Sequence, residues 1–275
     1  MSIGVVHLVR ASNGIEPFSR FVESYRQMKA GANHDLILVF KGFGKNPELS
    51  GYRRLLAGLN CKAIFLKDFG FDIRPYFIVA RKFKYLYYCF FNSFSIILDE
   101  NWLAKLFHAI SNEKVGLVGA TGSYESVYSH MLSLEREYGS FTKKIVAAFR
   151  LNYYKKWFDP FPNYHIRTNA FMISGNHMRN IHMGPMLKKI HAMRFESGKS
   201  GLTKQIFRMN LKALVVGKDG IAYDKEDWCY SNTYALGTQS NLLVSDNRTQ
   251  IYSKSDLKGR QVISKLAWGD KNSKI

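Results

Sequence analysis

Cysteine, acidic residues and long apolar runs are all scarce in this chain, and each shortage excludes a class of protein. The 275 residues include three cysteines, Cys61, Cys89 and Cys229. Their odd number and wide spacing provide neither a disulfide framework nor a zinc motif, so we expect them to be packing residues. No run approaches the roughly 18 consecutive apolar residues of a membrane-spanning helix, and the start MSIGVVHLVRAS lacks the charged region and cleavage site of a signal peptide. We therefore expect a cytoplasmic protein.

Glycine-rich phosphate loops and metal-ligand motifs are missing as well. The segment after the first expected strand reads RASNGIEPF, without G-x-G-x-x-G or G-K-[ST]. This disfavours a kinase, an NTPase and a classical dehydrogenase. The second half holds several histidines, but none forms an H-x-x-x-H pair with an intervening Glu, so we expect no clustered zinc site.

Positive charge is what the chain has in excess. It carries 40 Lys and Arg against 21 Asp and Glu, a formal net charge of +19. Such a balance favours a polyanionic partner: nucleic acid, anionic lipid headgroups or a phosphorylated substrate. Between Gly139 and Arg194 the only acid is Asp159, and this zone includes the run FTKKIVAAFRLNYYKKWF. Its interleaved aromatic and basic residues indicate either a helix that lies on an anionic membrane or an ordinary helix with a solvated basic face.

Strand and helix patterns alternate through the first 120 residues, as expected of an α/β sheet of the nucleotide-binding kind. The expected strands are Ile3–Val9, Leu36–Phe40, Ala63–Leu66, Tyr85–Phe91 and Val115–Gly119. The expected helices are Pro17–Ala30, Tyr52–Leu59, Ile73–Phe83 and Asn101–Ile110.

The second half is less regular. We expect a strand over Ala170–Ile173, a helix from there to about Ile190, a helix over Leu202–Met209 and a strand over Leu211–Val216. Beyond Gly217 the pattern becomes irregular and polar. We therefore predict a domain of residues 1–217 and an extension of residues 218–275 that closes over the site.

Polar residues gather where the expected strands end. The aromatic run Tyr85–Phe91 has no helical period, as in a strand buried on both faces, and ligands of open α/β sheets bind beyond the carboxyl ends of such strands. Arg suits a diphosphate because guanidinium binds phosphate oxygens bidentately, and the lone carboxylate of Glu196 suits a general base. Turn chemistry and helix capping remain the alternative for any one polar cluster. The candidate binding residues are Arg10, Asn13, Asp72, Arg74, Asn92, Ser93, Glu125, His165, Arg167, Asn169, Asp246 and Arg248.

Five segments carry a family resemblance over roughly residues 1 to 220. They read GFDIRPYFIVA, YLYYCFFNSFSIILDENWLAKL, VGLVGATGSYES, HIRTNAFMIS and RFESGKSGLTKQIFRMNLKALVVGKDG. Their order resembles bacterial glycosyltransferases of the GT-A fold, and most of all the branch that makes polysaccharide and lipopolysaccharide, including O-antigen and capsule. The resemblance implies a GT-A-like, Rossmann-like mixed and mostly parallel sheet flanked by helices, with an irregular C-terminal extension.

The resemblance also implies roles. Arg10 to Asn13 would hold the nucleotide base, Asp72 would contact the nucleotide, and Glu196 would deprotonate the acceptor hydroxyl of an inverting enzyme. Here Ser197 stands where such enzymes carry a further acid.

A second departure concerns the metal that these enzymes bind on the donor diphosphate. The acidic motif expected at the end of the central strand is replaced by Asn92-Ser93, and an amide and a hydroxyl hold hard cations weakly. Either Asp72 and an outside group complete a metal site, or Arg10, Arg74 and Arg167 neutralise the diphosphate. We favour the second alternative.

The resulting hypothesis is a glycosyltransferase that moves a sugar from a nucleotide-diphosphate donor to a glycan or lipid-linked glycan, with peripheral contact at the inner membrane. We expect no nucleic acid as a partner of this enzyme. The alternative from another class is a non-catalytic basic module that binds nucleic acid or anionic membrane, with steeply salt-dependent affinity.

Overall fold

The computed structural model describes residues 2–44, 49–135 and 141–270. Its strands are β1 (Ile3–Arg10), β2 (Asp35–Lys41), β3 (Cys61–Leu66), β4 (Tyr87–Phe91), β5 (Ile96–Ile97), β6 (Val115–Gly119), β7 (Gly122–Ser123), β8 (His165–Ile166), β9 (Ala170–Ser174), β10 (Lys212–Val216), β11 (Ala222–Tyr223) and β12 (Val244–Ser245). Its α-helices are α1 (Glu16–Gln27), α2 (Ser50–Leu56), α3 (Ile73–Lys82), α4 (Trp102–Ile110), α5 (Val127–Glu135), α6 (Phe141–Trp157), α7 (Gly175–Asn180), α8 (Lys189–Ser197), α9 (Leu202–Arg208), α10 (Asn247–Lys254) and α11 (Leu257–Trp268).

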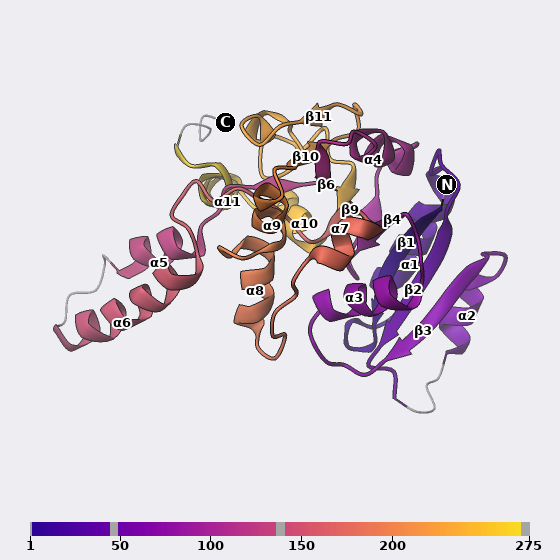
Figure 1. The fold of residues 1–275 in the computed structure, drawn as a ribbon, viewed down its shortest axis with the longest axis horizontal. Helices are drawn as coiled ribbons and strands as arrows, with labels where there is room; N and C mark the ends of the chain where they lie inside the picture. The colour runs from indigo at the N-terminus through magenta and orange to yellow at the C-terminus, as the bar shows by residue number, and fades with distance from the viewer. Residues whose placement is uncertain (1, 45–48, 136–140, 271–275) are drawn as a thin grey trace.

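One large sheet organises the molecule (Figure 1). Within the described residues its eight strands follow the order β11-β10-β6-β9-β4-β1-β2-β3. Neighbours pair in parallel except where β9 meets β4 and β6, and where β11 meets β10. The expected mixed, mostly parallel sheet flanked by helices is confirmed.

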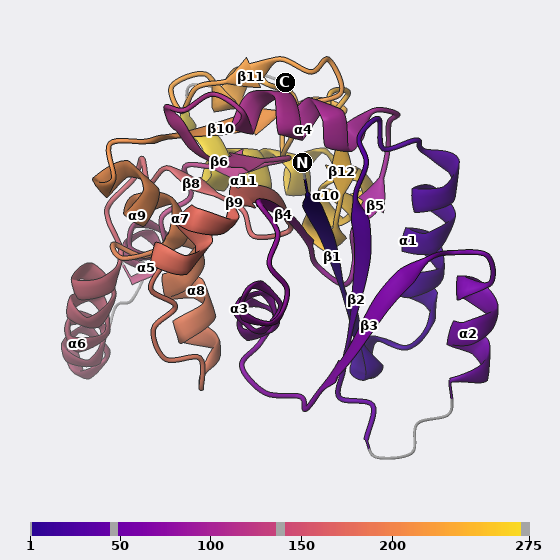
Figure 2. The same cartoon turned by 45° about the vertical axis from the view of Figure 1, so that its right-hand side comes forward.

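Alternate side chains of the central strands feed two hydrophobic cores, one on each face of the sheet. In β1, Val6 and Leu8 lie in the core that includes residues of α3, whereas Val5 and Val9 lie in the core that includes residues of α1 and α4. Figure 2 shows α3 on one side of β1 and β2, and α1 and α2 on the other. A strand buried on both faces carries a nearly continuous apolar run, which is why these segments were recognisable in the sequence.

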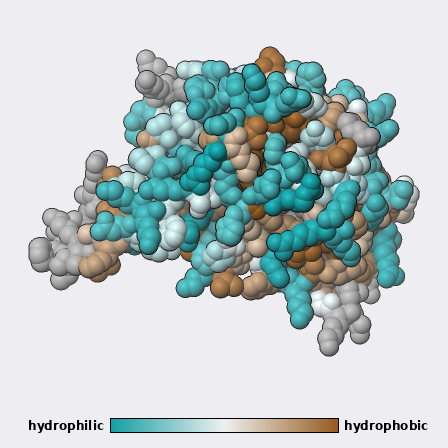
Figure 3. All heavy atoms as spheres, in the orientation of Figure 1, coloured by the Kyte–Doolittle hydropathy of each residue, from teal (hydrophilic) through white to brown (hydrophobic). Residues whose placement is uncertain are grey.

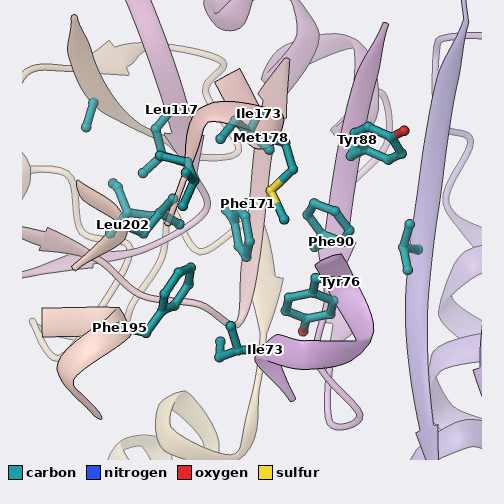
Figure 4. Packing of buried hydrophobic residues seen from close by; sticks show 14 of the residues in the cluster. Ile73, Tyr76, Tyr88, Phe90, Leu117, Phe171, Ile173, Met178, Phe195 and Leu202 are labelled. Carbon is teal, nitrogen blue, oxygen red and sulfur yellow. The ribbon is translucent and has the colours of Figure 1, made fainter. Parts of the chain in front are cut away.

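Aromatic packing fixes α3 against β4 and β9 (Figure 4). The ring centroids of Tyr76 and Phe90 are 4.7 Å apart, and those of Phe90 and Phe171 are 5.2 Å apart. Because α3 starts directly after Asp72, this contact also holds the Asp72 backbone beside the ends of these strands.

The reversed strand β9 brings its preceding loop to the carboxyl end of β4. Phe91 pairs with Ala170 at that end, and the Asn92 amide N–H donates to the Asn169 carbonyl at 2.8 Å. The carboxyl end of β6 reaches the same place, since the Ala120 amide donates to the Ala170 carbonyl at 3.0 Å. Three strands thus present their flanking loops at one edge of the sheet.

The expected helix from β9 to about Ile190 is wrong in its extent. Ser174 caps α7 by accepting a hydrogen bond from the His177 amide at 3.1 Å, and the helix ends at Asn180, where Ile181 is already extended. Pro185 follows and could not donate within a continuing helix. A separate helix, α8, then carries Glu196 in its last turn.

Residues 218–270 are more regular than their sequence pattern indicated, because they include α10 and α11. Trp228, Tyr234, Tyr252 and Trp268 are buried in the same core as the residues of α3 and β9. These aromatic residues anchor the extension to the sheet. The division of the chain at Gly217 stays a prediction.

Helices α5 and α6 pack against each other and form an arm that projects from the body, on the left of Figure 1. The first two residues of the basic zone, 139 and 140, lie outside the described residues. Among the helices described, none is both long and apolar enough to span a bilayer.

Candidate functional site

A cavity of about 640 Å³ opens at the edge where β1, β4 and β6 end and β9 begins. Ten of the thirteen residues singled out in the sequence line it: Arg10, Asp72, Asn92, Glu125, His165, Arg167, Asn169, Glu196, Asp246 and Arg248. The other three, Asn13, Arg74 and Ser93, do not line it. The Arg74 guanidinium instead lies 4.8 Å from the ring centroid of Phe69.

Arg10, at the end of β1, faces a pair of acids. Its guanidinium lies 3.4 Å from an Asp68 oxygen and 3.7 Å from Asp72 Oδ1, and the buried Lys41 ammonium lies 2.9 Å from Asp68. Burial raises the pKa of Asp72, and the nearby Arg10 and Lys41 only partly oppose this. Asp72 Oδ1 and Arg10 Nε are buried and have no hydrogen-bond partner among the described protein groups. Both groups can therefore still bond to a ligand.

The end of β4 forms a tight turn around Asn92. Asn92 Oδ1 accepts from the Phe94 amide at 3.0 Å and from the Ser95 hydroxyl at 3.1 Å. The buried Ser93 hydroxyl accepts from Asn13 Nδ2 at 2.8 Å. Asn13 and Ser93 thus brace the turn beside the cavity. This is the turn chemistry that was the alternative explanation for polar residues at strand ends.

Glu196 is oriented by one residue of the loop before β9. Its Oε1 accepts from the Thr168 amide at 2.7 Å and from the Thr168 hydroxyl at 3.1 Å. Because both bonds fall on Oε1, the other carboxylate oxygen is left for a different partner. A fixed carboxylate on a cavity wall has the geometry that a general base needs.

His165 lies next to this carboxylate within the cavity lining. Its Nδ1 is 2.8 Å from the Asn163 carbonyl, which can only accept, so Nδ1 carries the proton and Nε2 of the neutral ring is an acceptor. Burial lowers the pKa of His165, whereas Glu196 acts in the opposite direction. The ring is therefore held neutral at physiological pH.

Arg167 joins the sheet to the C-terminal extension. Its guanidinium lies 2.8 Å from Asp246 Oδ2, donates to the Thr121 hydroxyl at 3.3 Å and stacks 4.2 Å from the centroid of Tyr234. Arg167 and Asp246 are both buried. This ion pair positions α10, whose N-terminus Asp246 caps by accepting from the Thr249 amide at 2.9 Å.

Asn169 supplies a second buried donor without an acceptor. It is 3% exposed and its Oδ1 accepts from the Thr121 hydroxyl at 2.8 Å. Its Nδ2 has no partner among the described protein groups. A buried N–H without an acceptor costs about 1–3 kcal/mol, a cost that an anionic ligand in the cavity would remove.

Sequence reasoning missed several lining residues, among them Phe71, Lys189 and Tyr234. Tyr234 lies in the stretch after Gly217, where no periodicity separates a buried aromatic residue from an exposed one. Lys189 lies where a single long helix was expected, so the start of a new helix at the cavity was not recognisable. Phe71 precedes Asp72 and has a positive φ of 51°. Phenylalanine rarely adopts this backbone conformation, so its residue type did not predict the turn that places it at the cavity.

The lining residues do not fit a divalent metal of the kind that GT-A enzymes hold. Both lone pairs of Asn92 Oδ1 are used by the turn, Asp246 is bonded to Arg167 and Thr249, and Glu196 Oε1 to Thr168. In the described ranges, no three His, Cys, Asp or Glu side chains gather closely enough to hold a metal ion. Mg²⁺ and Mn²⁺ require several such oxygen ligands.

A second surface of interest lies on the projecting arm. Val146, Phe149 and Tyr153 of α6 are 66%, 74% and 45% exposed, and their spacing of three and four residues places them on one helix face. Figure 3 shows tan and brown residues on this arm beside those drawn in grey. Lys155 and Lys156 follow in the last turn of α6. The arm therefore combines exposed apolar and basic side chains.

No family model matches this sequence, and no curated protein matches it. Among solved structures, the chain is similar to the mannosyltransferase PcManGT of Pyrobaculum calidifontis in complex with GDP-Man and Mn²⁺, with a TM-score of 0.52 at 9% identity. The match covers 84% of this chain and 59% of that chain, so our chain spans less than two thirds of it.

Two further similarities are weaker. Mouse xyloside xylosyltransferase 1, in its apo form, matches with a TM-score of 0.42 at 12% identity, over 79% of this chain and 85% of its own. S. aureus TarS 1-349 in complex with UDP-GlcNAc matches with a TM-score of 0.35 at 13% identity, over 43% and 34%. With the mannosyltransferase this chain shares a GT-A-like fold, as the sequence predicted.

Proposed function

We propose that this protein is a glycosyltransferase, which moves a sugar from a nucleotide-diphosphate donor to a glycan or lipid-linked glycan acceptor in bacterial surface polysaccharide synthesis. The observation that carries the proposal is the meeting of Asp72, Asn92 and Glu196 in one cavity, although each lies 20 or more positions from the next along the chain. The cavity lies beyond the carboxyl ends of parallel strands, where open α/β sheets bind their ligands. The fold shared with a mannosyltransferase supports the same class.

The proposed donor site spans the loops after β1 and β4. Arg10 and Asp72 would contact the nucleotide, with Asn13, Asn92 and Ser93 shaping the wall behind it. Arg74 has no part in this arrangement, because it lies outside the lining. The other predicted substrate-binding residues of the lining would contact the donor or the acceptor: Glu125, His165, Arg167, Asn169, Asp246 and Arg248.

Glu196 is the proposed base. Its carboxylate takes the proton of the acceptor hydroxyl while that oxygen bonds to the anomeric carbon of the sugar. The bond from this carbon to the diphosphate oxygen breaks, and the nucleoside diphosphate leaves with the electron pair. A single displacement of this kind inverts the anomeric centre. The Thr168 bonds to Oε1 keep the carboxylate from rotating away.

The arm supports a peripheral contact with anionic membrane. Its apolar face of Val146, Phe149 and Tyr153 would enter the interface, and Lys155 and Lys156 would contact lipid phosphates. Such a contact would bring the cavity to lipid-linked acceptors at the inner leaflet. The run FTKKIVAAFRLNYYKKWF, for which the sequence indicates either membrane contact or a solvated basic face, includes this helix.

The test is a panel of UDP-, GDP- and dTDP-sugars, assayed for binding, hydrolysis and transfer. We expect one donor to bind saturably and to be consumed. Glu196→Gln should lower transfer by at least about 100-fold, as expected for loss of a general base, while donor binding persists. Glu23→Gln, an exposed change on α1, should leave both unchanged. Absence of binding and turnover with every donor would contradict the proposal.

The rival is a non-catalytic basic module for nucleic acid or anionic membrane, which the net charge of +19 favours. It predicts binding that weakens steeply with salt and no saturable nucleotide-sugar site. A fluorescence titration with UDP and GDP at two salt concentrations separates the two functions.

A further inference from the structure

Two cations line the cavity at helix starts, where a positive charge does not stabilise the helix. Lys189 is the first residue of α8, and Arg248 is the second residue of α10. Both side chains line the cavity and both residues are exposed. The N-terminal end of a helix carries partial positive charge, so a cation in its first turn is unfavourable by a few tenths of a kcal/mol. An anion between the two helices would reverse this cost, because it meets both the helix ends and the side chains.

The lining of the cavity holds further donors without acceptors. The 3% exposed Asn169 lines the cavity with an unpartnered Nδ2, and Arg10 Nε is likewise unpartnered among the described protein groups. Acceptor oxygens of a phosphate would satisfy both. These donors are independent of the helix ends and indicate the same kind of ligand.

Three of the four carboxylates that line the cavity have a cationic or hydrogen-bonding partner, and Glu125 is the fourth. Asp246 is paired with Arg167 at 2.8 Å, Glu196 Oε1 accepts two bonds from Thr168, and Asp72 faces Arg10. At the end of β4, where the GT-A resemblance implies an acidic motif, Asn92 uses its amide oxygen within its own turn. The site thus offers unpaired donors, and among the described residues its carboxylates do not gather into the set of oxygen ligands that a divalent cation requires.

We infer that the donor diphosphate is held without a divalent metal, by Lys189 and Arg248 at the starts of α8 and α10 together with Arg10 and Asn169. This inference rests on the proposed function and specifies which positively charged and amide groups hold the diphosphate in its donor site. In this arrangement the leaving diphosphate is stabilised by fixed cations and amide donors, and the extension contributes one of its main ligands through α10.

Calorimetric titration of the whole protein with GDP and with UDP tests this, once in EDTA and once in Mn²⁺. We expect the better nucleotide to bind in EDTA with an affinity that Mn²⁺ changes by less than about tenfold, or 1.4 kcal/mol. Binding that appears only with Mn²⁺ would overturn the inference and leave the proposed function standing. Absence of binding in both buffers would contradict the proposed function and the inference with it.

Matched charge variants sharpen the test. In EDTA, Lys189→Gln and Arg248→Gln should each weaken binding by about tenfold or more, as for lost hydrogen bonds to a charged group. Lys188→Gln and Lys254→Gln remove the same charge from exposed positions outside the cavity lining and should have much smaller effects. Equal effects of all four variants would reduce the role of the cavity cations to non-specific charge and contradict the inference.

Discussion

Arg167 and Asp246 form a buried ion pair of 2.8 Å that ties the loop before β9 to the N-terminus of α10. The side chains are 10% and 2% exposed. Removing one partner of such a pair leaves the other charge buried and alone, which costs about 3–5 kcal/mol. The pair therefore links the stability of the extension to the shape of the cavity.

Asp246→Asn tests this linkage. Asparagine can still cap α10, so the variant removes the ion pair and keeps the cap. We expect the free energy of unfolding, measured in urea, to fall by about 3 kcal/mol. Asp256→Asn is the control: Asp256 caps α11 by accepting from the Gly259 amide at 2.8 Å. It forms no ion pair with another of the described residues, so the effect should stay within about 1 kcal/mol. Equal losses from both substitutions would show that the buried pair adds nothing.

His7 gives the fold a sensitivity to acid. It is fully buried in β1, stacks on Phe21 with ring centroids 3.6 Å apart, and neither ring nitrogen has a partner among the described protein groups. Burial lowers its pKa to about 3. The unfolded chain binds a proton below the ordinary pKa of 6.5, and the folded chain does not. The lowered pKa therefore costs the fold nothing above about pH 6.5, and below it the free energy of unfolding falls progressively as the pH drops toward 3.

His7→Leu should raise the free energy of unfolding at pH 7 by about 1–3 kcal/mol, since it removes unsatisfied buried nitrogens. The difference from the natural protein should grow by about 2 kcal/mol between pH 7 and pH 5. Urea unfolding of both proteins at the two pH values measures this. A difference that stays constant with pH would mean that His7 is protonated in the folded state.

We expect Asp72 to lower the stability of the fold and to strengthen nucleotide binding. Its raised pKa, caused by burial, means that the fold disfavours the ionised carboxylate, so Asp72 lowers stability at pH values above its ordinary range. Asp72→Asn should therefore unfold at the same or a higher urea concentration and bind nucleotide more weakly. Asp68→Asn should do the opposite to stability, because the hydrogen bond from buried Lys41 holds the pKa of Asp68 low. A marked loss of stability in Asp72→Asn would give this residue a structural role.

The exposed face of α6 predicts a separable membrane contact. Phe149 is 74% exposed, so Phe149→Ser should change the free energy of unfolding by no more than about 0.5 kcal/mol. Co-sedimentation with vesicles that contain anionic lipid should fall clearly for this variant. Leu86→Ser, a 60% exposed position just before β4, is the control. If Phe149→Ser and Leu86→Ser reduce binding to the same extent, the arm has no special role.

Strands of the main sheet could be predicted because their apolar runs are short, β-branched or aromatic, and bounded by turn residues. β6 has the predicted bounds, β1, β9 and β10 differ from theirs by one residue at one end, and β2 is longer than predicted by one residue at each end. Residues flanking such strands meet at the sheet edge, so Arg10, Asn92 and Asn169 could be placed at one site. The pairing of the strand backbones fixes where these flanking residues lie, whatever their side chains are.

The rest depends on contacts between distant segments. Nothing local shows that Asp246 pairs with Arg167, 79 residues earlier, or that Tyr234 covers that guanidinium. The break between α7 and α8, which places Lys189 at the cavity, follows from packing around Met186 and Phe195 and from Pro185. Arg74 illustrates the reverse case: it lies two residues from Asp72, yet its position on α3 directs it to Phe69.

The most direct measurement is a crystal structure of the protein with GDP or UDP bound. We predict that the nucleotide occupies the cavity, with Asp72 at the nucleotide, the diphosphate within hydrogen-bonding distance of Lys189 or Arg248, and the Glu196 carboxylate facing the space beyond the diphosphate. A nucleotide bound at another surface, with this cavity left to solvent, would contradict the claim on which the glycosyltransferase hypothesis rests, that this cavity binds the donor.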